Sequence, residues 1–544
     1  MRVPRQISGI SWMLTICLII LSGCGGDSDS EDYYVPQADP AADSQLTHDA
    51  YPYESPDDTE PDAEDNLGTV ISAEPQRDNV IPLGLQYALD VANIRRENLV
   101  RPNIDRIAGL VEGRTTRLDM MRFYQPPERT GGQLLSTADA MYDAQAFFDS
   151  LRYTYGAYTY FGGDEVFLPI FNEIMDTLAG YDYWDVRDFG NLIFDSLRPM
   201  LRDNHLSFGG HRFSVSADIY VWASPFDRTP YGFRSRLNGL YVAEIVGHDL
   251  EDVFRLNIDN TGDMHYIPII VVRGGAGTRH YPVTVRYEND DYEIVDFIRH
   301  SPTRRDFSNS RLRREQGIPI VTVRTMGFPA STHRGSNAID AQRFLSFAEE
   351  LRDEPIVIVD IRSNGGGFGL LSAQWLYLLT GEIVPNNFMW LMTRSYHEWQ
   401  EVIASGTPES MFYIPTDVFR QFSLSEPVGD YHTLNRSPTE GIVQRDQILI
   451  LLVDRYTASA GDGFADRMFN MTNTLVVGQN TGGVLHTDLT HPNLFLPRSG
   501  LNFGMGRSIN IHPEGHLDEG VGITPDIWVT GNALTAVLAM LSRE

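Results

Sequence analysis

Ser459 lies where a nucleophile could be built. It follows the apolar run QILILL (447–452), which predicts a buried strand, and it precedes a helical pattern that starts at Gly463. The residues around it in VDRYTASAGD (453–462) are mostly small. A serine at such a strand-to-helix turn lies beside the free N–H groups of the helix start, which can stabilise an oxyanion. The position indicates acyl transfer, provided that some group takes the serine proton.

The composition excludes one common partner of a serine nucleophile. All 43 residues counted as Lys or Arg are arginine, because the 544-residue sequence contains no lysine. A Ser–Lys pair is therefore impossible, and arginine cannot act as the base because it does not deprotonate. The candidate bases are histidines: His205, and the rivals His486, His491 and His512 near the later loops. Taken alone, His205 could also be a histidine that interacts with a helix end.

Two glycine-rich loops follow apolar strands. They are VDIRSNGGGFG (359–369) and VGQNTGGV (477–484). Neither has the spacing or the lysine of a phosphate-binding loop, and neither has the glycine spacing of a dinucleotide fold. Adjacent glycines do allow the backbone to approach a substrate with its N–H groups, although a simple tight turn is an equal alternative. No histidine, cysteine or carboxylate cluster has metal-ligand spacing, so we expect neither a metal nor a cofactor.

The elements that must position these residues fall into three stretches. Apolar residues at three- and four-residue spacing predict helices over about 79–210. Short alternating strands follow up to about 302, and beyond 315 apolar strands alternate with helices. Apolar strands separated by helices predict a layered α/β domain whose sheet faces are covered.

Four motifs together identify a resemblance to a known family. IVIVDIRSNGGG, LLVDRYTASAGD, VVGQNTGG and DEGVGITPDI resemble, in order and spacing, motifs of the tail-specific (C-terminal processing) serine peptidases. The resemblance implies a crotonase-like ββα core, which we assign to residues 315–535. It implies Ser459 as the nucleophile, with Asp462 in place of the usual glutamate, and an oxyanion hole made by the N–H groups of Gly366 and Ala460.

The same resemblance suggests the base. Where many family members carry a lysine, this sequence has Val484. A second branch, similar to the tricorn core, uses a histidine from the helical region and a glutamate six residues before the proline of the last motif. Here those positions are His205 and Glu519, with Asp518 as a rival for the glutamate. The branch therefore implies a Ser459–His205–Glu519 triad.

The strand-rich stretch has a weaker resemblance. The segment VVRGGAGTRHYPVTVRYENDDYEIVDFIR (271–299) is similar to the last half of a PDZ domain as it occurs in these peptidases. We expect a divergent PDZ-like module over 228–302. A β-rich insertion that binds no peptide is the alternative.

The N-terminal sequence predicts export. Residues 1–23 have early arginines and an apolar run too short to span a bilayer, which is typical of a signal peptide. LSGC (21–24) resembles the bacterial lipobox, so we expect lipidation of Cys24; a chance cysteine after an ordinary signal is the alternative. Residues 27–65 contain 14 Asp or Glu and no Arg, which predicts a disordered tether over 24–78. This tail supplies nearly half of the net charge of −30, and the acidic balance argues against nucleic-acid binding.

These patterns predict an exported serine endopeptidase, lipid-anchored in the bacterial cell envelope at the outer membrane or periplasmic face. Its partners would be polypeptide substrates and, through Cys24, a membrane. The sequence leaves open the oligomeric state. Two other functions remain possible: an inactive lipoprotein that uses the same fold to bind peptides, and an esterase with the same triad.

Overall fold

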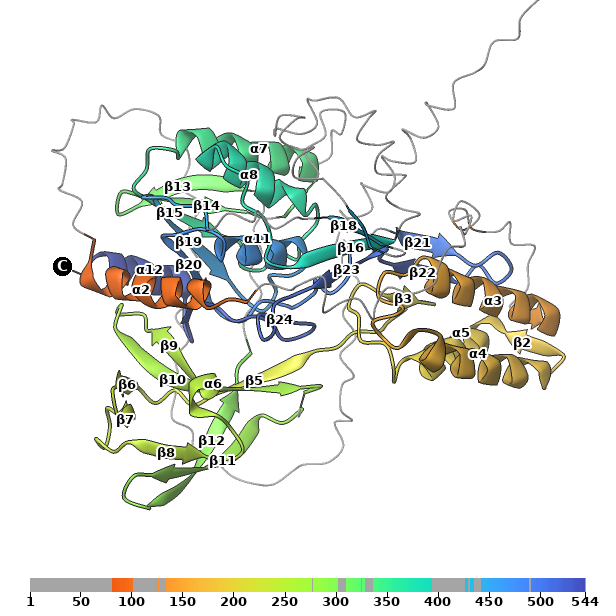
Figure 1. The fold of residues 1–544 in the computed structure, drawn as a ribbon, viewed down its shortest axis with the longest axis horizontal. Helices are drawn as coiled ribbons and strands as arrows, with labels where there is room; N and C mark the ends of the chain where they lie inside the picture. The colour runs from red at the N-terminus through yellow and green to blue at the C-terminus, as the bar shows by residue number, and fades with distance from the viewer. Residues whose placement is uncertain are drawn as a thin grey trace, which may run out of the picture. The chain divides into compact units, whose positions relative to one another are not determined.

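The fold was analysed in a computed structural model of the chain (Figure 1). The structure describes residues 81–100, 123, 126, 134–275, 277–301, 310–323, 325–327, 336–393, 426–428, 431–434, 442–488 and 491–543. From Pro82 onward these residues belong to one compact unit. The sequence predictions for residues 1–78, Cys24 included, lie outside the described residues.

A parallel sheet forms the centre of the α/β part. Its strands β14 (Ile318–Thr322), β15 (Ile356–Asp360), β19 (Ile448–Val453), β20 (Thr474–Gly478) and β26 (Ile527–Trp528) lie side by side and parallel, with β13 (Arg311–Glu315) antiparallel at the edge. The helices of this part are α7 (Ser336–Glu350), α8 (Leu370–Thr380), α11 (Ala460–Met468) and α12 (Ala533–Leu541).

Helices cover both faces of this sheet (Figure 1). Alternate strand residues pack on one side against α7, α8 and α11, namely Val357, Val359, Leu449, Leu451 and Val476. The residues between them pack on the other side against α12 and α2 (Leu83–Glu97), namely Ile358, Ile450, Leu452, Leu475 and Val477. Covered parallel strands need apolar residues on both faces, which explains their uninterrupted apolar sequences. The predicted α/β class is confirmed.

The β-rich stretch continues the same sheet. Its elements are β5 (Ala217–Val221), β6 (Phe226–Thr229), β7 (Gly232–Ser235), β8 (Val242–Ile245), α6 (Leu250–Val253), β9 (Phe254–Ile258), β10 (Met264–Arg273), β11 (His280–Tyr287) and β12 (Tyr292–Arg299). Trp528 of β26 pairs with Asn257 of β9, so the strand order runs on through β9, β10, β5, β12, β11 and β8.

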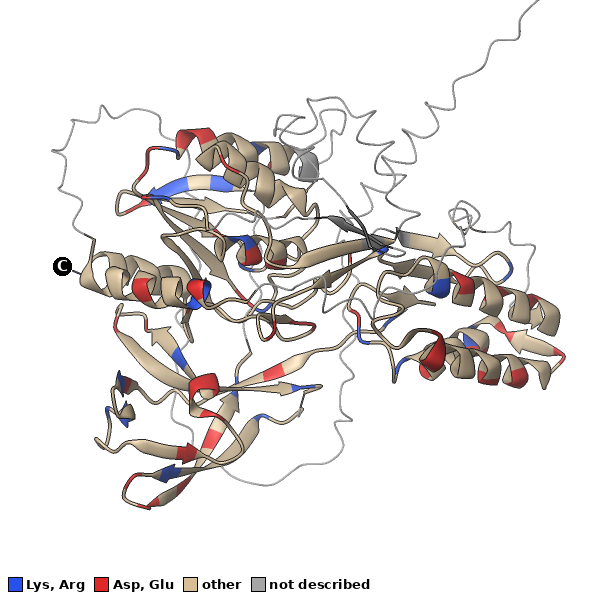
Figure 2. Cartoon of the chain, in the orientation of Figure 1, with Lys and Arg blue, Asp and Glu red and all other residues tan. Residues whose placement is uncertain are grey.

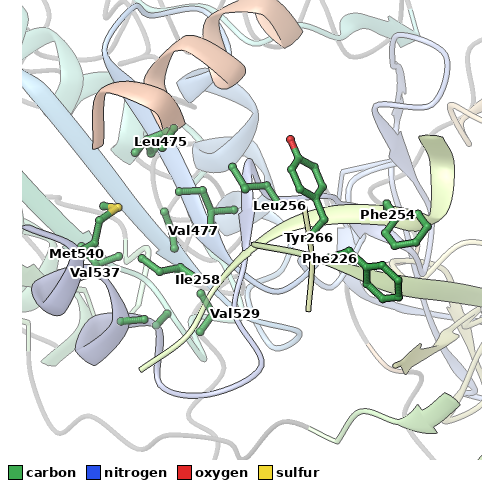
Figure 3. Close-up of a cluster of buried hydrophobic side chains, with 14 of the residues drawn as sticks. Phe226, Phe254, Leu256, Ile258, Tyr266, Leu475, Val477, Val529, Val537 and Met540 are labelled. Carbon is green, nitrogen blue, oxygen red and sulfur yellow. The ribbon is translucent and has the colours of Figure 1, made fainter. Parts of the chain in front are cut away.

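The hydrophobic core also crosses this junction. Figure 3 shows Leu475 and Val477 of β20 in one cluster with Val537 and Met540 of α12 and with Ile258 of β9. The β-rich strands thus share a core with the central sheet. A PDZ-like identity for this stretch stays a prediction.

The N-terminal helices form a second packed region. They are α3 (Thr137–Tyr153), α4 (Gly163–Ala179) and α5 (Val186–Leu197), with β1 (Leu134–Ser136) paired to β2 (Tyr183–Asp185). Ser136 and Asp185 cap α3 and α5 by accepting backbone N–H groups, as expected of residues at helix starts. The core of this region is rich in phenylalanine. Phe503 of a later strand packs into it, with its ring centroid 5.2 Å from that of Phe147.

Three small sheets complete the described fold. One joins β16 (Met389–Thr393), β17 (Glu426–Val428), β18 (Tyr431–Leu434) and β23 (Ser508–Ile511), and another pairs β24 (Leu517–Asp518) with β25 (Gly522–Ile523). The third joins β21 (His491–Phe495) and β22 (Asn502–Met505) to β3 (Ser207–Phe208) and β4 (His211–Arg212). It brings the residues after α5 to the C-terminal part of the chain. Among the described residues, no helix has both the length and the apolar character needed to span a bilayer.

Candidate active site

Ser459 lies at a sharp turn between β19 and α11. Its φ is +53° and its ψ is −114°, in a region that non-glycine residues rarely adopt. Such a conformation costs about 1–3 kcal/mol and persists only where its surroundings enforce it. The turn places the serine hydroxyl at the start of the helix, where Ala460 contributes an N–H with no acceptor inside α11.

Asp454 holds the turn in place. Its carboxylate accepts the backbone N–H groups of Tyr456 (2.9 Å) and Thr457 (3.0 Å) within the turn. It also accepts the N–H of Ser363 (2.8 Å), which belongs to the triple-glycine loop after β15. One buried carboxylate therefore fixes the serine turn and the glycine loop to each other.

Arg455 fixes the same turn to more distant segments. Its guanidinium donates to the carbonyl oxygens of Thr481 (2.5 Å), Val521 (2.8 Å), Ala217 (3.3 Å) and Gly520. Three segments of the chain thus meet at this side chain, and burial lowers the pKa of the guanidinium.

Gly366 lies directly against the serine. Its φ is +105°, and a Cβ atom there would come within 2.7 Å of the Ser459 Cβ and 2.9 Å of the Ala460 nitrogen. Only glycine fits this position. The glycine loop therefore lies where the resemblance placed it.

The N–H of Gly366 was expected to be free to stabilise an oxyanion, but in the structure it already has an acceptor. It donates to the Asn364 side-chain oxygen (3.0 Å), and the Asn364 amide nitrogen donates to the Val323 carbonyl (3.0 Å), which fixes the amide orientation. A side-chain oxygen two residues earlier commonly captures a backbone N–H in this way. In this arrangement Ala460 retains the available N–H beside the serine.

His205 lies within hydrogen-bond distance of the serine. Its Nε2 is 3.2 Å from the Ser459 Oγ, and its Nδ1 is 2.9 Å from the carbonyl oxygen of Thr487. A carbonyl can only accept, so Nδ1 carries the proton in the neutral ring and Nε2 is free to accept from the serine. The pair has the geometry that a general base and its nucleophile require.

The position of His205 follows from the fold around it. It occupies a turn between α5 and β3, and β3 pairs with β22 through Phe208 and Phe503. The neighbouring Asn204 donates its amide to the Gly483 carbonyl (3.3 Å) in the second glycine-rich loop. Contacts on both sides therefore carry the histidine to the serine turn.

Glu519 is close to the site but differs from its expected role. Its oxygens accept the backbone N–H groups of Asn204 (2.9 Å), His486 (3.0 Å) and Leu485 (3.3 Å). Within the described residues, no hydrogen bond joins Glu519 to the His205 ring, because the Thr487 carbonyl occupies Nδ1. The expectation that Glu519 contacts the imidazole is therefore corrected: it holds the backbone on both sides of the histidine. Burial, and then the nearby Asp203 carboxylate, raise the pKa of Glu519 well above its usual value.

Two residues beside the base were missed by the sequence analysis. Asp203 accepts the backbone N–H of His205 (2.8 Å), and Thr487 supplies the carbonyl that orients the ring. The signal for Asp203 was its place two residues before the histidine. A backbone carbonyl such as that of Thr487 has no sequence signature.

The rival bases lie in other settings. His512 is held near the Leu485 carbonyl (3.3 Å), and burial lowers its pKa to about 3. Burial also lowers the pKa of His486. Its ring packs edge-on against that of Tyr160, with the two ring centroids 4.6 Å apart. His491 starts β21, and its side chain lies outside the described part of the chain. The rival acid Asp518 forms an ion pair with Arg273 of β10.

Asp462 and Val484 replace two usual residues of the family motifs, and the structure joins them. The buried Asp462 carboxylate accepts the N–H of Val484 (2.9 Å) and that of Gly483 (3.1 Å). Burial raises the pKa of Asp462. The aspartate therefore fixes the second glycine-rich loop against α11. Val484, at the position where many family members carry a lysine, takes part in this contact through its backbone N–H.

One group of potential metal ligands occurs in the described part of the chain. Asp259 and Asp263 of the turn between β9 and β10 lie close to His265 of β10. Asp263 is already paired with Arg236 (2.6 Å) and Arg543 (3.4 Å). Because arginines already occupy this carboxylate, we assign no metal site here. Acidic and basic residues are also interspersed over the described elements (Figure 2).

Comparison with known proteins gives a family match. Residues 320–529 match the model described as peptidase family S41. No curated protein matches the chain at a significant level.

Several solved structures are similar to the chain. That of mature CPAF has 12% identity and a TM-score of 0.40 and covers 75% of this chain and 95% of that chain. The photosystem II D1 C-terminal processing protease has 13% identity and a TM-score of 0.34, with 75% and 97% covered. The tricorn protease has 13% identity and a TM-score of 0.28, with 72% and 34% covered. At TM-scores this low, the likenesses carry no functional information.

Proposed function

We propose that Ser459 and His205 carry out the reaction of this serine-type tail-specific peptidase, whose residues 320–529 match the model of peptidase family S41. The observation that supports this proposal best is the contact of 3.2 Å between the His205 Nε2 and the Ser459 Oγ. The second supporting observation is the hydrogen bond from His205 Nδ1 to the Thr487 carbonyl. It sets the ring tautomer that leaves Nε2 able to accept a proton. The substrates are polypeptides, as the family implies.

The reaction follows an acyl-enzyme route. Ser459 Oγ attacks the carbonyl carbon of the peptide bond while its proton passes to His205 Nε2. The carbonyl oxygen becomes an oxyanion beside the N–H of Ala460, which lies at the positive end of α11. The imidazolium then gives its proton to the leaving amine as the C–N bond breaks. Water, deprotonated by the same imidazole, hydrolyses the serine ester and regenerates the enzyme.

The strained serine favours an enzyme over an inactive peptide-binding protein. A binding module gains nothing from holding Ser459 at φ +53° and ψ −114° or from aligning a histidine with its hydroxyl. An esterase would use the same chemistry, so the choice between the two rests on the peptidase family match.

A fluorophosphonate probe tests the site directly. The purified chain should be labelled at Ser459, and Ser459→Ala should lose both labelling and hydrolysis of an unstructured protein such as casein. Labelling together with hydrolysis of simple esters but of no polypeptide would favour the esterase. No labelling of the folded chain would favour the inactive peptide-binding protein.

We extend the proposal to the place where the enzyme acts. The signal-like residues 1–23, the lipobox-like LSGC and the acidic stretch behind it support export, lipidation of Cys24 and a tether that holds the peptidase away from the membrane of the cell envelope. A tether of this kind would let a membrane-anchored peptidase reach substrates at some distance from the lipid surface.

A further inference from the structure

Asp203 has a fully buried carboxylate beside the base. One oxygen accepts the backbone N–H of His205 (2.8 Å). Both oxygens lie within hydrogen-bond distance of the Thr487 hydroxyl (3.0 and 2.9 Å), and the second accepts the Tyr155 hydroxyl (2.6 Å). A buried carboxylate is costly unless such donors surround it, and two of the donors here belong to His205 and Thr487.

These contacts link the two partners of the ring hydrogen bond. The His205 Nδ1–H donates to the carbonyl of Thr487, a residue 282 positions later in the chain. Asp203 holds the histidine through its main chain and holds Thr487 through its hydroxyl. The donor and the acceptor of the orienting hydrogen bond are therefore attached to one carboxylate.

We propose that Asp203 is the positioning residue for the base: it fixes the distance and orientation between the His205 ring and the Thr487 carbonyl, and its charge stabilises the imidazolium that forms during acyl transfer. This inference rests on the proposed reaction of Ser459 and His205. Asp203 acts through the main chain of the histidine and through Thr487, and it does not contact the reacting atoms.

Glu519 complements this arrangement. It accepts the N–H groups of Asn204 and His486, each adjacent to a residue that Asp203 holds. The two carboxyl groups thus bind the same two segments, 203–205 and 485–487, to each other. Burial, and then the Asp203 charge, raise the pKa of Glu519, which disfavours a negative charge on Glu519 itself.

The test separates the contact of the Thr487 hydroxyl with Asp203 from the effect of the Asp203 charge on the base. Thr487→Val removes the hydroxyl while keeping the shape of the side chain, and Thr487→Ser keeps the hydroxyl. We expect kcat to fall by about a hundredfold in Thr487→Val with little change in KM, and to remain near wild type in Thr487→Ser. Asp203→Asn should lower kcat and also move the acidic limb of the kcat/KM profile to lower pH, because loss of an anion disfavours the imidazolium.

Tyr155→Phe is the matched control. It removes one hydrogen bond to the same carboxylate and leaves in place the two groups, the His205 N–H and the Thr487 hydroxyl, that tie the carboxylate to the base. Its melting temperature should fall, while its pH profile and kcat should stay close to those of wild type. An equal loss of kcat in Tyr155→Phe and Thr487→Val would show that the effect is general destabilisation, which overturns the inference.

Ser459→Ala distinguishes failure of the inference from failure of the proposed reaction. If Ser459→Ala is inactive but Thr487→Val and Asp203→Asn keep wild-type kcat and pH profiles, Asp203 is only structural. If Ser459→Ala still hydrolyses polypeptides at the wild-type rate, the proposed reaction itself is wrong.

Discussion

His205 Nε2 lies 3.2 Å from Ser459 Oγ, although 254 positions separate the two residues in the chain. The approach depends on pairing between β3 and β22 and on the contacts of the second glycine-rich loop with Asn204. Ser459 and His205 therefore come from two regions of the fold that must pack correctly for the proposed reaction to occur.

We expect His205→Ala to lose at least about a thousandfold in kcat while the protein keeps its melting temperature within a few degrees. The imidazole is part-buried and removing it leaves the Asp203 and Glu519 contacts to the main chain intact. Turnover of a fluorogenic peptide and thermal unfolding measure the two effects.

His512→Ala is the control for this experiment. Because burial holds its pKa at about 3, His512 is a poor acceptor of the serine proton at neutral pH and its loss should leave most of the activity. If His205→Ala turned over at the wild-type rate while Ser459→Ala was inactive, the base would have to be sought at His486 or His491.

Gly366→Ala should impair both folding and labelling of the serine. Its Cβ would lie 2.7 Å from the Ala458 carbonyl and the Ser459 Cβ, at a φ of +105° that alanine disfavours. We expect a loss of about 1–3 kcal/mol in the free energy of unfolding and much slower reaction with a fluorophosphonate. Urea unfolding and labelling kinetics provide the measurements.

The preceding residue provides a matched variant. A Cβ at Gly365 would meet nothing within 4 Å, so Gly365→Ala should unfold and react almost as wild type does. Equal behaviour of the two variants would contradict the close approach of the glycine loop to the serine.

Glu519 should make stability depend on pH. Its pKa is raised in the folded state by burial and by the Asp203 charge, so its contribution to stability is present below the unfolded pKa near 4.5 and is lost as the pH rises through the folded value. Glu519→Gln removes this ionisation. Relative to wild type, the melting temperature of the variant should therefore increase as the pH is raised from about 5 to about 8.

The variant is expected to be less stable overall, because an amide cannot accept all the N–H groups that the carboxylate accepts. The test is therefore the trend with pH and not the absolute difference. A constant difference in melting temperature across the range would argue against a raised pKa.

Cys24→Ser should release the protein from membranes. The variant lacks the thiol that a lipid would modify, and the remaining signal-like segment would be processed differently or retained. Fractionation of cells followed by immunoblotting measures the distribution. Equal recovery of the variant and the wild type in the membrane fraction would contradict lipid anchoring at this residue.

The sequence was most informative where side chains have a distinctive chemistry. Ser459 could be predicted from the elbow, and the absence of lysine excluded a Ser–Lys pair, but His205 was chosen among four histidines only through the family resemblance. The structure brings Ser459 and His205 together. The sequence could not predict that the Thr487 carbonyl orients the ring, or that Asn364 captures the Gly366 N–H, because both depend on backbone positions set by tertiary packing.

The same limit applies to the fold. Uninterrupted apolar runs such as that of β19 identify covered parallel strands directly. The continuation of that sheet into the β-rich stretch depends on the pairing of Trp528 with Asn257, two residues far apart in the sequence whose types do not indicate pairing. Local patterns therefore predicted the elements, and long-range contacts decided how they join.

The contacts of Arg455 have a consequence for the order in which the site can form. The guanidinium beside Ser459 donates to carbonyl groups of Ala217, far upstream, and of Gly520 and Val521, downstream of the serine turn. The serine turn therefore gains its full set of contacts only after segments on both sides of it in the sequence have folded onto it.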